Sequence, residues 1–335
     1  MIFPRATFLV LPLLGVVFAT ASGEPKPADP GTLVVANQGD HTLLTIDLAT
    51  EKTLSKTEVG VNGHEVAVAP DGKFAYVPIY GNSGVGRPGT DGDRVDIVDL
   101  HTHALAGHID LGKPVRPHCA KFGPDGLLYV SAELDNAIYA IDTATRKVVA
   151  KNPTDAEESH MFVITPNGKR AYTTNVGAGS VSVVDLYAHK LITKIDVAKT
   201  VQRISISPDG NYVFTHDQDQ PRIAMIDTSN NKIAKWIDVP GTIYSSAVTP
   251  DGAHLVAASP VGKVFVIDIA ESKIISTFDV PKSAGELILA PDGQRAFLSC
   301  PQAASIQILD LSSGKITASI ALTKGVDGLD WLRTP

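Results

Sequence analysis

The chain has 335 residues, of which 44% are hydrophobic and 19% charged, and its formal net charge is −7. This composition is typical of a folded globular protein and excludes an intrinsically disordered one. The acidic balance, without any cluster of Lys or Arg, argues against binding to nucleic acid through its phosphates.

The first 21 residues have the pattern of a cleaved signal peptide. Arg5 supplies the positive charge, residues 8–19 form an apolar run, and Ala19-Thr20-Ala21 provides the small residues of a cleavage site. The run is too short to span a bilayer comfortably, and no later segment reaches the roughly 18 apolar residues of a membrane helix. We therefore expect a periplasmic or secreted protein, in which residues 22–31 form a leader ahead of a single domain at 32–335.

A repeat with a period of about 40 residues extends over this domain. One marker is a Pro-Asp-Gly turn, in which proline presets φ, Asp bonds its own backbone and Gly takes a positive φ. Its prolines are 54, 42, 42, 42 and 41 residues apart, at Pro70, Pro124, Pro166 (where Asn replaces Asp), Pro208, Pro250 and Pro291. A second marker is an aliphatic residue followed by Asp, in seven copies: Ile46-Asp47, Val98-Asp99, Ile141-Asp142, Val184-Asp185, Ile226-Asp227, Ile267-Asp268 and Leu309-Asp310.

Each repeat predicts four β-strands. Between the markers lie alternating runs, such as residues 171–175 and 180–184, that have the period of a β-strand. Strand A precedes the Pro-Asp-Gly turn, strand B follows it, strand C ends at the aliphatic-Asp pair, and strand D comes last. The sequence therefore predicts an all-β fold, a seven-bladed β-propeller with four antiparallel strands per blade. In the last blade, strand A from residues 328–335 pairs with strand B from residues 33–37, so the N- and C-terminal strands close the ring.

Two strand B segments carry a resemblance to a known family. Tyr172-Thr173-Thr174-Asn175 and residues 33–37 (Leu-Val-Val-Ala-Asn) are similar to the motif that names the YVTN family of bacterial propellers. With the two markers, the resemblance covers nearly all of the domain. It implies an extracytoplasmic binding or scaffold protein, and the related seven-bladed groups include lactonases and cytochrome d1-like propellers of metal- or haem-containing oxidoreductases. A fold alone does not choose among these, so the sequence leaves open whether the chain is an enzyme.

Three histidines share one position of the repeat. The residue six before each turn proline is His64, His118 and His160 in consecutive units, and then Gln202, Tyr244, Gly285 and Leu329. Because equal positions of neighbouring blades converge on the channel axis, we expect the three imidazoles to meet at the channel mouth. Three neutral histidines with an open position form a ligand set for copper or zinc. The same set could instead exchange protons with a ligand.

Further ligand-binding candidates lie near these histidines in the repeat. Arg116 and Glu158 stand two residues before His118 and His160, and so should share their side of the strand. Tyr244 occupies the histidine position of a later blade. His216 ends a strand B and should face the same opening.

The next position along strand A is expected to point between the blades, because successive side chains of a strand alternate. Glu65, Arg203 and Glu286 lie at this position and are retained as candidate partners of a bound ligand, since the alternation is loose at a strand start. The full set is Glu65, Cys119, Met161, Arg203, Ser245, Glu286 and Asp330.

The first blade contains an insertion, residues 80–93, in its B–C loop. Long loops in compact repeats are usually functional or disordered, so this segment is either a lid over the channel mouth or a plain flexible loop. Cys119 and Cys300 fall in blades that are not neighbours, which predicts two free, buried thiols. The remaining histidines, such as His101, His103 and His108, are expected at the surface.

Three hypotheses follow from the sequence. In the first, the chain is an exported monomer that binds a small molecule or metal ion at the channel mouth through His64, His118 and His160. In the second, the same opening is the active site of a lactonase-like hydrolase or a metal-dependent oxidoreductase. In the third, the propeller is a scaffold for a protein partner and has no small-molecule site.

Overall fold

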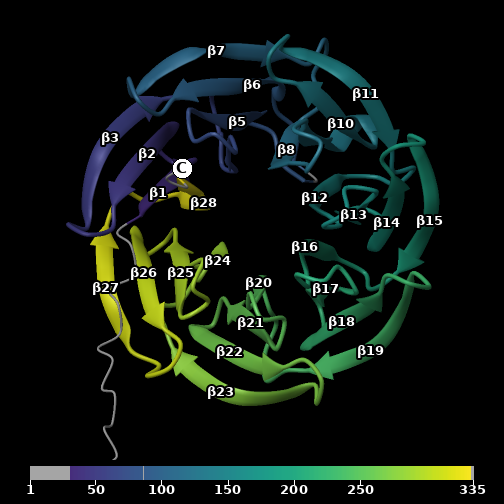
Figure 1. Cartoon of the computed structure of the whole chain (residues 1–335), viewed down its shortest axis with the longest axis vertical. Coiled ribbons are helices and arrows are strands. Elements are labelled where there is room, and N and C mark those ends of the chain that lie inside the picture. The colour runs from purple at the N-terminus through teal and green to yellow at the C-terminus, as the bar shows by residue number, and fades with distance from the viewer. Residues whose placement is uncertain (1–30, 86, 333–335) are drawn as a thin grey trace, which may run out of the picture.

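The computed structural model describes residues 31–85 and 87–332, and these form a ring of seven four-stranded sheets around a central channel (Figure 1). All strand pairs within the sheets are antiparallel, as the repeat predicts. The expected signal peptide, and the leader up to residue 30, lie outside the described residues.

The two inner strands of each blade are the ones that line or approach the channel. The innermost strands A are β4 (Ala67–Val68), β8 (Pro117–Phe122), β12 (Ser159–Ile164), β16 (Val201–Ile206), β20 (Ser245–Val248), β24 (Leu287–Leu289) and β28 (Val326–Leu332). The strands B are β1 (Thr32–Asn37), β5 (Phe74–Gly81), β9 (Leu128–Ala132), β13 (Arg170–Asn175), β17 (Tyr212–Asp217), β21 (His254–Ser259) and β25 (Arg295–Cys300). A single 3-10 turn, η1 (Glu133–Asp135), follows β9 within the described residues.

The two outer strands complete each blade. The strands C are β2 (Thr42–Asp47), β6 (Asp91–Asp99), β10 (Ala137–Asp142), β14 (Ser180–Asp185), β18 (Arg222–Asp227), β22 (Lys263–Asp268) and β26 (Ser305–Asp310). The strands D are β3 (Lys52–Glu58), β7 (Ala104–Asp110), β11 (Lys147–Pro153), β15 (Lys190–Asp196), β19 (Lys232–Asp238), β23 (Lys273–Asp279) and β27 (Ile316–Ala321). We number the blades from the β4–β7 sheet as blade 1, so the sheet β28-β1-β2-β3 is blade 7.

Local turn chemistry explains why the repeat folds in this way. In blade 3 the Gly168 N–H donates to the Thr165 carbonyl at 2.8 Å, with φ of 71° at the glycine. The aliphatic-Asp marker is a second turn device, because Asp185 Oδ1 accepts the backbone N–H groups of Tyr187 and Ala188 at 3.0 and 2.8 Å. Each marker thus ends one strand and reverses the direction of the chain before the next strand.

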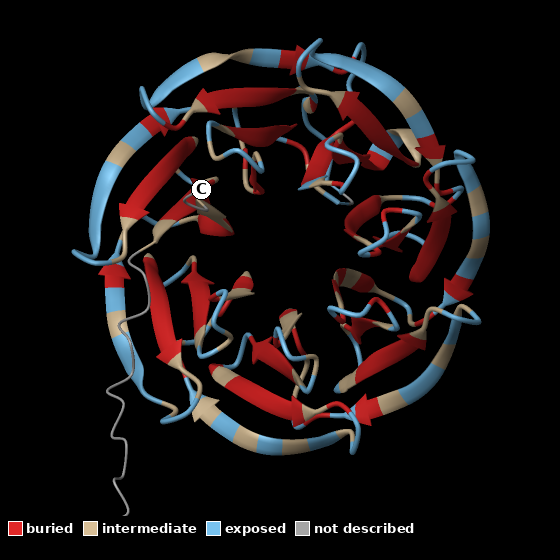
Figure 2. Cartoon of the chain, in the orientation of Figure 1, coloured by how far each residue is buried: buried red, intermediate tan, exposed pale blue. Residues whose placement is uncertain are grey.

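The hydrophobic core lies between neighbouring blades. The inner strands are largely buried, as in β13, whereas the outer strand β15 alternates between exposed and less exposed positions (Figure 2). Large side chains such as Tyr172, Phe214 and Phe297 are fully buried between the sheets. The ring is therefore held together mainly by the apolar area that adjacent blades bury against each other.

The termini close the ring as predicted, but with a register that the turn spacing did not give. Val326 pairs with Asn37 in blade 7, as Ser159 pairs with the equivalent Asn175 in blade 3. The residue equivalent to His160 is therefore Asp327. Counting six residues back from Pro335 predicts Leu329 at this position of the repeat, and that prediction is wrong by two residues.

The insertion at 80–93 extends β5 and β6 into a longer hairpin, and its tip lies between Gly81 and Asp91. Cys119 and Cys300 are both free and buried, and His101, His103 and His108 are exposed, as expected. Within residues 31–85 and 87–332, no helix has the length and apolar character needed to cross a membrane.

Candidate functional site

The three predicted histidines lie together at one end of the channel. His118 and His160 stand near the starts of β8 and β12, and His64 precedes β4. His64 Nε2 lies 2.7 Å from His118 Nε2, and the ring centroids of His118 and His160 are 3.6 Å apart. Equal register in three consecutive blades has thus brought residues that are 54 and 42 positions apart into direct contact.

A buried carboxylate joins this cluster from a loop. Glu133, in η1 directly after β9, is fully buried, and its Oε1 accepts a hydrogen bond from His160 Nδ1. Its Oε2 accepts the Tyr80 hydroxyl proton at 2.9 Å. His118, Glu133 and His160 each have a ligand atom within 4.8 Å of the others, so they form the group that could hold a metal ion. We refer to these three residues as the His-His-Glu group.

The hydrogen bonds assign the ring protons of the cluster. His160 Nδ1 faces a carboxylate and therefore carries a proton, while its Nε2 lies 3.4 Å from the Gln202 amide nitrogen. His64 Nδ1 lies 3.3 Å from the Asn62 amide oxygen, so its Nε2 accepts the proton of His118 Nε2. His118 Nδ1 then holds a lone pair, and it has no hydrogen-bond partner among the described residues although it is buried.

Burial keeps His64 and His118 neutral at pH 7. It holds the pKa of His118 well below its usual value and lowers that of His64, which is partly exposed at its edge, to about 4. Neutral imidazole is the form that binds metals. Burial, with Glu133 beside the ring, also raises the pKa of Tyr80, so its hydroxyl stays protonated and donates to the carboxylate.

Arg116 and Glu158 form the rim of the site. The Arg116 guanidinium lies 3.0 Å from Asp91 Oδ1 and 3.6 Å from both Glu133 Oε2 and Glu158 Oε1. Its charge is thus shared by three carboxylates, which leaves little of it for an anionic ligand. The hairpin of the insertion supplies Tyr80 and Asp91, so this segment forms a wall of the site.

Backbone conformation sets the direction of the histidines. Asn62, Arg116 and Glu158, each two residues before a histidine, have φ of 59°, 51° and 55°. Such left-handed residues are uncommon outside glycine and turn the chain sharply. Ser283 and Gly325 adopt the same conformation at the equivalent positions of blades 6 and 7, so it belongs to the repeat and is not confined to the site.

Arg203 corrects the expectation that its register points between the blades. The side chain is buried and reaches across the channel, where Nη1 contacts Glu286 and lies 3.2 Å from Glu65 Oε1. Nη2 lies 3.4 Å from Asp327 Oδ1, and the guanidinium packs over the Tyr244 ring at 4.9 Å from its centroid. An extended arginine side chain is long enough to reach across the channel from its own strand. We call the five residues that meet here the Arg203 layer: Arg203, Glu65, Glu286, Asp327 and Tyr244.

The remaining predicted residues do not join the His-His-Glu group. Tyr244 belongs to the Arg203 layer. His216 is fully buried, and its Nε2 lies 2.8 Å from Ser246 Oγ of the next blade. Sequence reasoning did not select Glu133, Tyr80 or Asp91 as site residues, since Glu133 lies in η1 and the other two lie at the ends of β5 and β6, and none is on strand A. An acidic residue directly after a strand B, at the opening that holds the histidines, was the available signal for Glu133.

Comparisons with known proteins support the fold and assign no function. No family model matches the sequence, and no curated protein matches it. Among solved structures, one titled "Kuenenia stuttgartiensis Hydrazine Synthase" has a TM-score of 0.71 and 19% identity, covering 88% of this chain and 99% of that one. A functionally unknown protein from Desulfotomaculum acetoxidans DSM 771 has a TM-score of 0.74 and 14% identity, covering 90% and 98%. At such identities the likeness shows the seven-bladed propeller alone.

Proposed function

We propose that this chain is an extracytoplasmic metal-binding propeller, whose ion is bound by His118, Glu133 and His160. The observation that carries the proposal is the buried lone pair of His118 Nδ1, which has no partner among the described residues and lies beside a buried carboxylate. A buried polar atom without a partner costs about 1–3 kcal/mol. Coordination to a cation removes that cost and also neutralises Glu133.

The donor set favours a transition metal over calcium or magnesium. Two imidazole nitrogens are borderline ligands that suit zinc or copper, and two histidines with one carboxylate form a zinc ligand set, whereas calcium and magnesium take oxygen ligands throughout. Three protein ligands leave a position for water or a small molecule, as in catalytic zinc sites. The proposal therefore includes a small ligand bound at the ion. Two enzymatic functions, hydrolysis and electron transfer, are the alternatives to simple binding, and the identity of the metal decides between them.

His64 and Tyr80 are placed to orient the ligands. His64 accepts the Nε2 proton of His118, and Tyr80 donates to Glu133. Such partners fix the tautomer and direction of a metal ligand, and losing one costs about 10–100-fold in affinity. In this proposal His64, which the sequence placed among the ligands, is an outer partner of His118. The location outside the cytoplasm rests on the signal-peptide pattern of residues 1–21.

Metal analysis of protein purified without a His-tag tests the proposal. After incubation with zinc or copper and gel filtration, we expect about one ion per wild-type chain, and none in the His118→Ala, Glu133→Gln or His160→Ala variants. His64→Ala should still bind, but about 10–100-fold more weakly. His101→Ala, at an exposed histidine, is the matched control and should bind like wild type.

Circular dichroism of each variant shows whether the ring is folded before metal is measured. If folded wild-type protein retains neither metal, or if His118→Ala binds as tightly as wild type, the proposal is wrong. If Glu133→Gln binds metal fully and His64→Ala binds none, the ligands are the three histidines expected from the sequence and not the His-His-Glu group.

A further inference from the structure

The channel also contains a hollow at its other end, where the Pro-Asp-Gly turns lie. Two adjoining cavities of about 540 and 960 Å³ share Lys121, Glu286, Ile288 and Trp331, and they extend to Pro124, Pro166, Pro250 and Pro291. They reach as far as Glu65 and Glu286, whose carboxylates hold Arg203. The Arg203 layer therefore separates this hollow, which we call the turn-side cavity, from the histidines.

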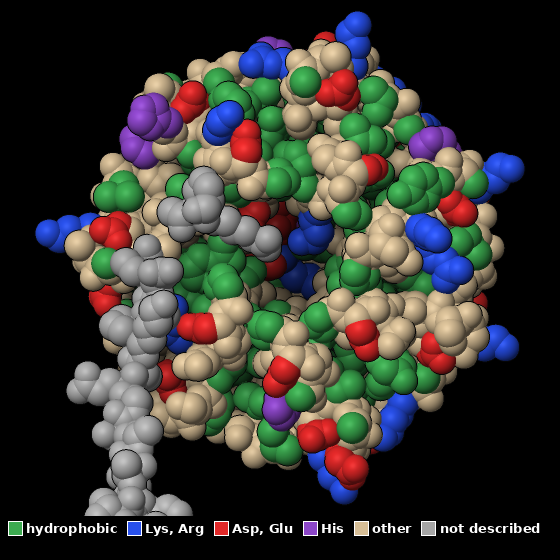
Figure 3. All heavy atoms as spheres, in the orientation of Figure 1, with side chains coloured by type: hydrophobic (Ala, Val, Ile, Leu, Met, Phe, Trp, Pro, Cys, Tyr) green, Lys and Arg blue, Asp and Glu red, His purple; other side chains and the backbone are tan. Residues whose placement is uncertain are grey.

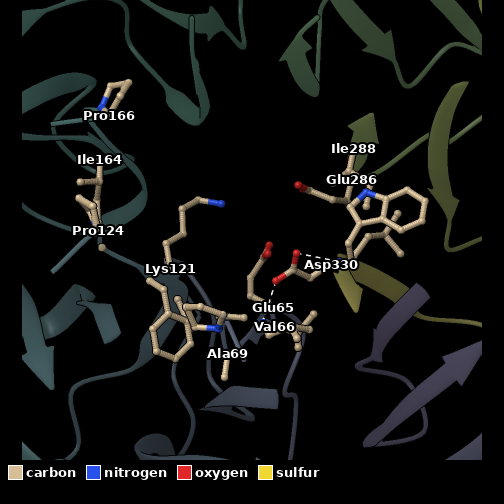
Figure 4. A pocket seen from close by; sticks show the side chains of 18 of the residues that line it. Glu65, Val66, Ala69, Lys121, Pro124, Ile164, Pro166, Glu286, Ile288 and Asp330 are labelled. Atoms are coloured by element: carbon tan, nitrogen blue, oxygen red, sulfur yellow. Dashed lines mark hydrogen bonds between the residues drawn. The ribbon is translucent and has the colours of Figure 1, made fainter. Parts of the chain in front are cut away.

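Lys121 is an exposed lysine at the wall of the turn-side cavity. It lies on β8, and Figure 4 shows its ammonium group extending from the wall into the open space. It makes no ion pair or hydrogen bond with any residue in the described ranges. The carboxylates opposite are engaged, because Glu65 and Glu286 bind Arg203. Asp330 accepts the Val68 N–H at 2.8 Å.

The walls around Lys121 combine apolar surface with a few hydroxyl groups. Ile164, Ile288 and Trp331 contribute apolar area. In the larger cavity the Ser205 and Ser246 hydroxyls lie 2.8 Å apart, and Ser246 is held by the buried His216 at 2.8 Å. An apolar hollow with a few fixed polar groups is the usual form of a small-molecule site. Figure 3 shows the face of the ring hollowed at its centre, with acidic and basic side chains inside.

We propose that the turn-side cavity binds a small organic monocarboxylate with an apolar body. The carboxylate would pair with Lys121, and the body would lie against Ile288 and Trp331, with the serine hydroxyls as further donors. A single negative charge fits better than a phosphate dianion, because Glu65 and Glu286 line the same space and repel a dianion more strongly than a monoanion. This inference is independent of the metal proposal, since the two sites lie on opposite sides of the Arg203 layer.

Calorimetric titration with benzoate, hexanoate and decanoate, each compared with its primary amide, tests this site. We expect wild-type protein to bind at least one carboxylate about tenfold or more tightly than the matching amide. Lys121→Met, which keeps most of the side-chain volume, should lose that preference, and Lys121→Arg should keep part of it. Lys190→Met, at an exposed lysine of the outer strand β15, is the control and should behave like wild type.

The results of these titrations show which ligand charge the cavity prefers and whether the two sites act independently. Equal binding of acid and amide by wild type, or an unchanged preference in folded Lys121→Met, overturns the proposal. Tighter binding of hexylamine than of hexanoate overturns it as well, because the carboxylates would then dominate. His118→Ala should bind carboxylates normally and Lys121→Met should bind metal normally, so the failure of one proposal leaves the other intact.

Discussion

Replacing Arg203 by Met removes the positive charge that three carboxylates from three other blades share. Glu65, Glu286 and Asp327 come from blades 1, 6 and 7, and all three contact the guanidinium across the channel. Methionine retains much of the side-chain volume, so the change removes charge and hydrogen bonds more than packing. The three carboxylates are then left facing one another in a largely buried layer.

The expected loss is about 3–5 kcal/mol, the usual cost of removing one partner from a buried ion pair. A ring of about 300 residues has an unfolding entropy near 0.6 kcal/mol/K, so the melting temperature should fall by about 5–8 °C. Burial already raises the pKa of Asp327 against the opposing effect of Arg203. Without the arginine, the pKa of Asp327 in the folded state rises further above that of the unfolded chain. The stability that Arg203→Met loses relative to wild type should therefore decrease as the pH falls from 7 to 5, because protons neutralise the carboxylates.

Thermal unfolding followed by circular dichroism, in wild type and Arg203→Met at both pH values, measures this loss. Arg146→Met is the control, because Arg146 is exposed and should change stability by less than about 0.5 kcal/mol. Adding Glu65→Gln and Glu286→Gln to Arg203→Met should restore at least about 1 kcal/mol. A loss below about 1 kcal/mol, or a deficit that grows as the pH falls, would refute the role assigned to the layer.

Two further perturbations test other parts of the ring. Burial lowers the pKa of His216 to about 3, so the fold holds its imidazole neutral and loses stability as the pH falls below the unfolded value of about 6.5. His216→Gln should reduce the stability lost between pH 7 and pH 5, measured by urea unfolding, by about 2 kcal/mol; an unchanged loss would contradict this assignment. Gly92→Ala would place its Cβ 1.6 Å from the Ile79 carbonyl oxygen in the β5–β6 hairpin and should cost more than about 2 kcal/mol, whereas Gly241→Ala, with no atom nearer than 3.6 Å, should be nearly neutral. Equal melting temperatures for the two glycine variants would show that the hairpin can move to accept the methyl group.

The sequence by itself determined the architecture, because the signals that set it are local. The Pro-Asn-Gly turn at Pro166, and the Asp185 turn between strands, fix the strand boundaries within one blade through nearby hydrogen bonds. Their regular recurrence gives the number of blades and the closure by both termini. It also predicts which strand A positions face the same opening, which is why His64, His118 and His160 could be selected together.

Tertiary structure alone decided which side chains complete the sites. Glu133 and Tyr80 reach the histidines from connections whose conformations are not part of the repeat, and Asp327 became the equivalent of His160 only through pairing of the two terminal strands. Arg203 contacts blades far from its own because its side chain is long enough to cross the channel. A repeat specifies which residues are neighbours in consecutive blades. Contacts across the ring depend on its diameter and on the length of each side chain, and they form only once the ring has closed.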